Sequence, residues 1–348
     1  MKTIRLALIS LAAAFGVLVA SGQQAQVVSV TGSATVLKPG ATAAVPLVIG
    51  EALPEGSVIT TGKGASALIE SHSGIQTGVG SESSVGVGAH SVSADGVRTA
   101  VIDLKNGTTV SVLDPSKRSV NNYAVRTPKG VAAARGTTYS TKVTLSSGGE
   151  AIVTVNTLTG SVSFAIVGGP TVAVTEGRSM ASNHSTSTTL AAAITGASSD
   201  AERTAITEAI EATVAVVSII AQAAPQVGDA PGQAQVTLLA VARTVTFAAN
   251  EVAKTDPAAG QALVTSTVTT VREYAGSSSN QVVNQVSSAS SAELQATVQA
   301  AAAAPVEVKT VTVTPATDSA PTTITAPAPT ATPTQPTPDI TIVESPSA

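Results

Sequence analysis

The residues of this chain that could do acid–base, nucleophilic or metal chemistry are few and scattered. Its three histidines are His72, His90 and His184, each beside serines in a turn-like context, and no two have the spacing of a zinc-binding pair. The chain has no cysteine, which excludes disulfides, thiolate metal ligands and a cysteine nucleophile. Serines are plentiful, but no G-x-S-x-G elbow surrounds one. We therefore interpret the histidines as loop or surface residues, and expect no catalytic residue, no cofactor and no metal. A hydrolase with a serine or carboxylate site is the alternative.

Residues 126–143, RTPKGVAAARGTTYSTKV, stand out in a chain with little charge and few aromatic residues. Its first eleven residues combine three cations with three turn-forming residues: Arg126, Lys129, Arg135, Pro128, Gly130 and Gly136. Pro128 should end the preceding strand because it has no N–H, and the two glycines allow backbone angles that other residues avoid. A guanidinium has five fixed donors, so we expect Arg135 to clamp a bend by bonding several carbonyls. Ligand binding by Arg135 is the alternative.

The composition limits the partners that the chain can have. Of its 348 residues only 11% are charged and 2% are aromatic, and the formal net charge is −4. Loss of a leader containing Lys2 and Arg5 would make it −6, which argues against DNA, RNA or anionic lipid. Tyr123, Tyr139 and Phe164 are too few to form a stacking surface, so we expect them in a core or at a strand edge.

The first 22 residues have the layout of a secretory signal peptide. Lys2 and Arg5 precede an apolar run over residues 6–20, which small residues follow. We expect an exported protein in the periplasm, associated with the outer membrane, or outside the cell. An uncleaved anchor is the alternative. No later segment is expected to cross a membrane, and no cysteine follows the run to carry a lipid.

Residues 26–185 are rich in valine, threonine, serine and glycine and predict short strands separated by turns. A bend at Gly32 separates two alternating stretches, and "TGKGA" separates two more. Asn106-Gly107 predicts a hairpin because both residues tolerate positive φ, and Thr159-Gly160 predicts another. This pattern is typical of a β-sandwich, a barrel or a rolled β-solenoid.

Residues 186–304 change to a helical period with many alanines. One helix should begin after Ser199, with Glu202 at capping-box spacing, and end at Pro225. Others are expected over residues 233–253, from Asp256-Pro257 to about residue 276, and over residues 290–304. We expect a small antiparallel bundle.

Residues 305–348 hold nine of the 18 prolines and no glycine. A Pro/Thr-rich segment of this kind favours extended polyproline II and predicts a disordered tail or spacer. Its alternating start, "VEVKTVTVT", could instead add a strand to a sheet.

The stretch around residues 126–143 resembles the FecR domain, the periplasmic part of a family of iron-citrate sensors and transmembrane signalling proteins. In that family a strand ends in Thr-Pro or a similar pair, and a short bend, an R-G-T triplet, an aromatic residue and a further strand follow. The matching positions are Thr127, Pro128, Arg135, Gly136, Thr137 and Tyr139. An upstream family signature is similar to residues 50–87, where Gly56, Thr61, Gly62 and Gly74 are among the matches. The resemblance extends over about residues 26–181.

The resemblance implies a mainly β fold, either a β-sandwich or a short β-solenoid, without enzymatic activity. In the family a cytoplasmic helical segment controls a sigma factor and a membrane helix follows it. Only five residues precede the apolar run here, so we do not expect that segment. The expected function is that of an exported, non-catalytic bacterial envelope protein. It would bind a protein or glycan and self-associate through its helices. A periplasmic signalling regulator acting through a separate membrane protein is the alternative.

Overall fold

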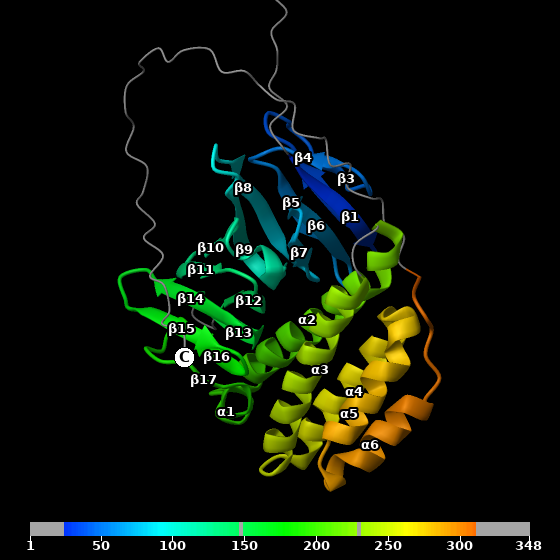
Figure 1. Ribbon diagram of the computed structural model, residues 1–348. Coiled ribbons are helices and arrows are strands. Elements are labelled where there is room, and N and C mark those ends of the chain that lie inside the picture. Colours follow the sequence, from blue (N-terminus) through cyan, green and yellow to red (C-terminus); the bar gives the residue numbers. More distant parts are fainter. Residues whose placement is uncertain (1–23, 146–148, 228–230, 311–348) are drawn as a thin grey trace, which may run out of the picture.

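The computed structural model describes residues 24–145, 149–227 and 231–310. A β region is followed by a layer of helices that packs against one side of it (Figure 1). The expected signal peptide, residues 1–22, and nearly all of the expected disordered tail lie outside the described residues.

The 17 strands form two ladders that are joined through one long strand, β9 (Arg98–Leu113). We call one the covered ladder, because the helices pack on it, and the other the open ladder. The covered ladder consists, in spatial order, of β4 (Ala52–Leu53), β1 (Ala25–Thr31), β6 (Ser66–His72), β7 (Ile75–Val79), the second half of β9, β12 (Thr138–Leu145), β13 (Ala151–Thr159), β16 (Arg178–Ala181) and β17 (Thr188–Thr189).

The open ladder consists of β3 (Val45–Pro46), β2 (Ala34–Leu37), β5 (Val58–Thr61), β8 (Ser84–Val92), the first half of β9, β10 (Asn121–Thr127), β11 (Gly130–Ala134), β14 (Ser161–Ile166) and β15 (Thr171–Thr175). Strands β9 and β10 run parallel, whereas the other pairs are antiparallel. The expected large β region is therefore present, and its assignment as a sandwich or solenoid stays a prediction.

Both expected hairpin turns are wrong, because they are corners between the ladders. Strand β9 continues through Asn106-Gly107, pairing with β8 and β10 before it and with β7 and β12 after it. Gly107 has φ +86°, and a Cβ there would lie 2.2 Å from the hydroxyl of Ser83. Gly160, at φ +76°, passes the chain from β13 to β14, which pair with other strands and not with each other. A positive φ here redirects the strand instead of reversing it.

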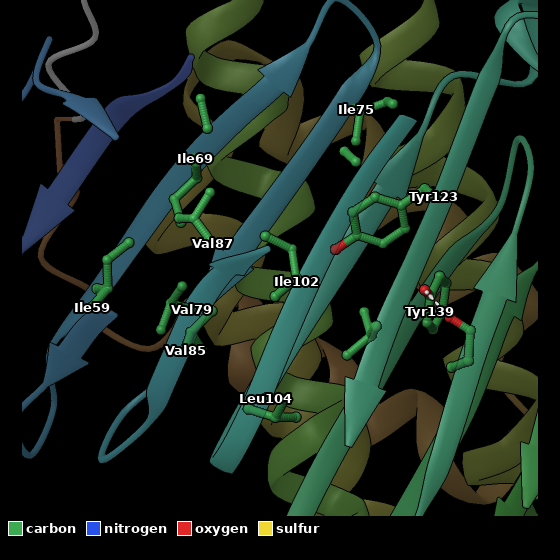
Figure 2. Packing of buried hydrophobic residues seen from close by; sticks show 14 of the residues in the cluster. Ile59, Ile69, Ile75, Val79, Val85, Val87, Ile102, Leu104, Tyr123 and Tyr139 are labelled. Carbon is green, nitrogen blue, oxygen red and sulfur yellow. Dashed lines mark hydrogen bonds between the residues drawn. The ribbon is translucent and has the colours of Figure 1, made fainter. Parts of the chain in front are cut away.

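The two ladders share one hydrophobic cluster, to which alternate residues of each strand contribute. Figure 2 shows Ile59, Val85 and Ile102 of the open ladder beside Ile69 and Val79 of the covered ladder. The few aromatic rings also lie here, as expected. The side chains of Tyr123, Tyr139 and Phe164 are fully buried.

The helical region contains the four expected helices and two shorter ones. They are α1 (Leu190–Thr195), α2 (Asp200–Val227), α3 (Pro231–Ala253), α4 (Pro257–Tyr274), α5 (Ser279–Ala289) and α6 (Ala292–Ala303), with the 3-10 turn η2 (Gly276–Ser278) between α4 and α5. A second 3-10 turn, η1 (Pro115–Lys117), lies in the β region between β9 and β10. Helix α2 begins where Ser199 accepts from the N–H of Glu202, and it ends two residues later than expected. At α4, Asp256 accepts from the N–H of Ala259, as its N-cap position predicts.

The helices complete a second core between themselves and the covered ladder. Val216 and Ile219 of α2 pack on Val28 and Val110, and Leu158 of β13 joins the core among the helices. Strand β7 has Gly78 beneath α2, where a Cβ would lie 2.4 Å from a methyl group of Val216. The missing side chain lets the helix approach the sheet closely.

We expected no later segment to be long and apolar enough to cross a membrane. This expectation is wrong, because two helices meet both criteria. Residues Asp200–Ala223 of α2 and Gly232–Ala253 of α3 have mean hydropathies of 1.6 and 1.3. In this structure 61% and 56% of those windows are buried against the sheet and the other helices, as in a core helix of a globular protein. Their apolar residues therefore form the second core.

Candidate functional site

Strands β10 and β11 form a hairpin, and the first of them ends just before Pro128, as that residue predicts. Strand β10 ends at Thr127, whose hydroxyl accepts from the N–H of Gly130 at 3.1 Å and donates to the carbonyl of Gly130 at 2.8 Å. Gly130 is needed for close packing and not for its φ, since a Cβ there would lie 2.5 Å from the carbonyl oxygen of Ala165. The segment after the hairpin turn is strand β11, where the family pattern has a short bend.

Arg126, Lys129 and Arg135 have different environments. Arg126 makes a two-pronged ion pair with Asp103, with Nε–Oδ1 at 2.5 Å and Nη2–Oδ2 at 2.8 Å. This hydrogen bond raises the pKa of Arg126. Lys129 pairs with Glu150 at 2.5 Å and lowers the pKa of that carboxyl. Arg135 is exposed, and its guanidinium makes no hydrogen bond to the described residues, so the expected clamp is wrong.

Thr137 and Gly136 hold the bend in place of Arg135. The hydroxyl of Thr137 donates to the carbonyls of Ser161 (3.0 Å) and Arg135 (3.3 Å). Gly136 has φ +66°, and a Cβ there would lie 2.7 Å from Cα of Pro115. Backbone carbonyls in this bend are therefore bonded by a short, buried threonine that loses little side-chain entropy.

Tyr139, the aromatic residue of the same motif, belongs to a buried polar cluster. Its hydroxyl donates to the carbonyl of Ala132 at 3.4 Å, and burial raises its pKa well above 10. The neighbouring Tyr123 shares hydrogen bonds with Thr77 (2.8 Å) and Ser111 (3.2 Å), and burial raises its pKa to about 12. Both phenols stay protonated at any physiological pH, so neither is an acid–base group.

The upstream motif residues lie at the ends and corners of strands. Thr61 is buried; its hydroxyl donates to the carbonyl of Gly80 and accepts from the N–H of Ser83. Gly56 and Gly74 have φ +87° and +81°, whereas Gly62 needs only the space beside a carbonyl oxygen. Each position has a local structural contact, and their role as a structural family motif stays a prediction.

Two of the histidines are not the loop or surface residues that we expected. His72 of β6 is buried and His90 of β8 is half-buried, and their rings stack with centroids 4.0 Å apart. His72 Nε2 contacts the carbonyl of Thr99 at 3.2 Å, and His90 Nε2 contacts that of Ser71. Burial first, and then the charges of His90 and Arg98, lower the pKa of His72 to about 4. No local sequence signal could have paired these rings, because the two strands belong to different ladders.

His184 is an exposed loop residue, as expected. Among the described residues no three His, Cys, Asp or Glu side chains are grouped closely enough to hold a metal ion. His72, the buried member of the stacked pair, is neutral at pH 7, and its ring contacts a backbone carbonyl. The pair is therefore better suited to packing than to proton transfer.

The outer face of the open ladder is a surface of the β region that the described helices leave uncovered. We call it the open face, and define it by the residues that alternate with the core: Val58, Gly86, Val101, Asp103, Ala124, Arg126, Val131, Ala133, Ser163 and Ala165. Register places Val101, Ala124, Ala133 and Ser163 side by side across four strands. The next row across carries the Asp103–Arg126 pair at its centre. The side chains of the open face are therefore mostly small and uncharged except for that pair.

Comparison with known proteins supports the resemblance over the centre of the β region. Residues 57–163 match the family model of the FecR protein. No curated protein matches the chain in sequence.

Two crystal structures of a candidate anti-sigma factor from Parabacteroides distasonis ATCC 8503, at 2.50 and 1.65 Å resolution, also align with it. Their sequence identities are 12% and 13%, and both TM-scores are 0.29. Each alignment covers 36% of this chain and 53% of the solved chain, so the chain spans about half the length of that protein. A TM-score this low does not establish a shared fold.

Proposed function

We propose that this chain, whose residues 57–163 form a FecR domain, is a non-catalytic signalling regulator of the bacterial cell envelope that works by docking a partner protein. The FecR family is one of signal receivers, which favours regulation over a purely structural role. The same docking step would serve an envelope scaffold, and the experiments below separate the two.

The position of the FecR domain in the fold carries this proposal. The matched residues run from β5 to β14 and so contribute to both ladders. Helices α2 and α3 cover β9, β12 and β13, which removes the covered ladder from contact with a partner. What the FecR domain presents outward is the open face, and we propose that the partner binds there.

The chemistry of the open face suits a protein partner better than a glycan or a nucleic acid. Val101, Ala124 and Ala133 offer a flat apolar strip without the exposed aromatic rings that sugars and bases stack on. The Asp103–Arg126 pair is partly exposed, with 54% of the arginine side chain accessible, so Arg126 can exchange its carboxylate for one on the partner. Arginine at the centre of an apolar patch is a common source of binding energy.

A location in the cell envelope is also part of what we propose. The layout of residues 1–22 supports export, and the burial of α2 and α3 in the second core supports action through a separate membrane protein. The Pro/Thr-rich composition of residues 305–348 supports a spacer. Glycan binding and self-association through the helices stay predictions.

Crosslinking in intact cells with matched surface variants tests the docking step. Ala124→Glu places a charge in the middle of the open face, whereas Ala296→Glu places the same charge on an exposed position of α6. We expect the first to abolish crosslinking to the envelope partner and the second to preserve it, with equal thermal melts for both. Equal crosslinking by both variants would exclude the open face.

Deletion of the gene tests the regulatory role. We expect altered expression of transporter genes or of genes that depend on an alternative sigma factor, because the signal would no longer pass to the membrane protein. An unchanged transcript profile would reject the regulator, and retained crosslinking through the open face would then support an envelope scaffold.

A further inference from the structure

One edge of the β region lacks the features that protect the other edges from pairing. Each ladder has two edge strands, and three of the four are only two residues long: β3 contains Pro46, β4 precedes Pro54, and β17 runs directly into α1. The fourth, β15, has five residues, TVAVT, with no proline and no charge. Natural sheets usually blunt such an edge with proline, lysine, a bulge or short length.

The hydrogen bonds of β14 fix which groups of β15 point away from the sheet. Val167 donates to the carbonyl of Lys129 on one side of β14, and Ile166 donates to that of Pro170 on the other. With antiparallel alternation, Val172 and Val174 therefore bond to β14. The N–H and C=O groups of Thr171, Ala173 and Thr175 point to the free edge.

These outward groups are almost free of partners among the described residues. The exception is the carbonyl of Ala173, which accepts from the hydroxyl of Ser187 at 3.3 Å, near the long limit for such a bond. The side chains of all three outward residues are exposed, while Val174 is buried in the core. The edge is thus an open template for another strand.

The sequence of β15 reads the same in both directions, and this symmetry identifies the other strand. We propose that two copies of the chain associate by antiparallel pairing of β15 with β15 about a two-fold axis at Ala173. Ala173 would then face Ala173 of the second copy, and Thr171 would face Thr175. All three pairs are of the hydrogen-bonded type, so about six N–H···O=C bonds form without displacing any bond to β14.

Charge and area define the strength of this contact. Strand β15 is uncharged, and the first charged residue beyond it, Glu176, would lie at opposite ends of the pair in the two copies. A pair of five-residue strands buries less surface than the ~1,200 Å² of a stable interface. The dimer is therefore weak and concentration-dependent, and an envelope protein tethered among neighbours would populate it by high local concentration.

Single-cysteine crosslinking tests the geometry directly, because the chain has no cysteine of its own. Opposed Ala173 Cα atoms would lie about 5.5 Å apart, within the range of a disulfide. Ser163, which faces Ala173 on the neighbouring strand and shares its outward face, would be roughly 15 Å from its counterpart. In the full chain we expect Ala173→Cys to form a disulfide dimer on mild oxidation and Ser163→Cys to stay monomeric.

Sedimentation of uncrosslinked protein over a range of concentrations tests the hydrogen bonds. Ala173→Pro removes only the outward N–H and should reduce the dimer association constant at least tenfold, whereas Ser187→Ala removes the competing hydroxyl and should increase it. Thermal melts of both variants serve as the control for folding.

The free edge of β15 could be occupied by a second copy or by the chain's own tail. A shortened chain that ends at residue 310 distinguishes these two occupants. Dimerisation by this shortened chain supports the proposal. Loss of dimer on shortening, a dimer unaffected by Ala173→Pro, or equal crosslinking of the two cysteine variants would overturn it. So would a monomer at all concentrations.

Discussion

Lowering the pH should weaken the fold through His72, whose buried ring stacks on His90. The pKa of His72 in the folded protein is lowered from 6.5 to about 4, first by burial and then by the charges of His90 and Arg98. The unfolded chain therefore binds the proton more tightly than the folded protein does. The free energy of unfolding should be unaffected above about pH 7, fall as the pH drops from 6.5 to 4, and level off below 4.

The size of this loss follows from the difference between the two pKa values. A change from 6.5 to about 4 corresponds to ~3 kcal/mol, since each tenfold difference in proton affinity is worth about 1.4 kcal/mol. This is a large fraction of the ~5–15 kcal/mol that holds a typical domain together. A measurable destabilisation should appear by pH 5.

Urea unfolding of the wild type and of His72→Phe, at a series of pH values, isolates the effect from the carboxylates that titrate in the same range. The phenyl ring keeps the stack with His90 but binds no proton, at a cost of about 1 kcal/mol for the contact with the carbonyl of Thr99. Stability relative to His72→Phe should fall by ~3 kcal/mol between pH 7.5 and pH 4. The exposed His184, changed to Gln, is the control and should leave the pH dependence intact.

Parallel pH profiles for the wild type and His72→Phe would refute this reasoning, because they would mean that His72 binds protons equally well in both states. If the pH dependence of stability instead disappeared in the His184→Gln control, the effect would belong to the exposed loop and not to His72.

Three further changes test the corners, the helix contact and the buried phenol. Gly107→Ala should lower the free energy of unfolding by ~3 kcal/mol, because it combines a strained positive φ with a steric clash. Gly96→Ala, at a similar φ but in open space, should lower it by only ~1 kcal/mol, and urea unfolding distinguishes the two variants. Gly78→Ala should push α2 from the sheet at a cost of ~2 kcal/mol, and hydrogen exchange in α2 should rise while that in α6 is unchanged. Tyr123→Phe leaves two buried hydroxyls without their partner and should cost ~2 kcal/mol in thermal or urea melts; a loss below 0.5 kcal/mol would mean that those hydroxyls find other partners.

The helices could be predicted from the sequence because their signals are local. Apolar residues at three- and four-residue steps and the Asp256-Pro257 cap identify α2 and α4 almost to the residue. The short helices α1 and α5 were missed, since six to eleven residues carry too few periods to be recognised. Packing of α2 on the sheet depends on Gly78, which is far away in sequence and has no side chain to mark the contact.

The strands were recognised, but their connections were not. Asn106-Gly107 and Thr159-Gly160 are typical of hairpin turns because glycine supplies a positive φ, and a corner between ladders needs the same φ. Only the partners of the flanking strands distinguish the two cases, and those partners are non-local.

The same limit applies to the candidate site. The cations at Arg126, Lys129 and Arg135 are visible in the sequence. The carboxylates that pair with the first two are distant in sequence, because one comes from β9 and the other from the loop before β13. The guanidinium of Arg135, which was expected to clamp the bend, makes no hydrogen bond to the described residues, and only its carbonyl accepts one. The stack of His72 on His90 likewise depends on the approach of the two ladders.

The shared strand β9 also determines what can be cut from this chain and still fold. A fragment cut to residues 57–163 would lack β1, β2 and β15. Strand β5 would then lose its neighbour β2, β6 would lose β1, and β14 would lose β15. Because β9 is bonded to strands on both sides in both ladders, no shorter fragment on either side of it closes a core of its own. The smallest autonomous piece should begin near residue 25. During synthesis, the first strands must therefore wait for β12 to emerge before their hydrophobic faces are shielded from chaperones and proteases.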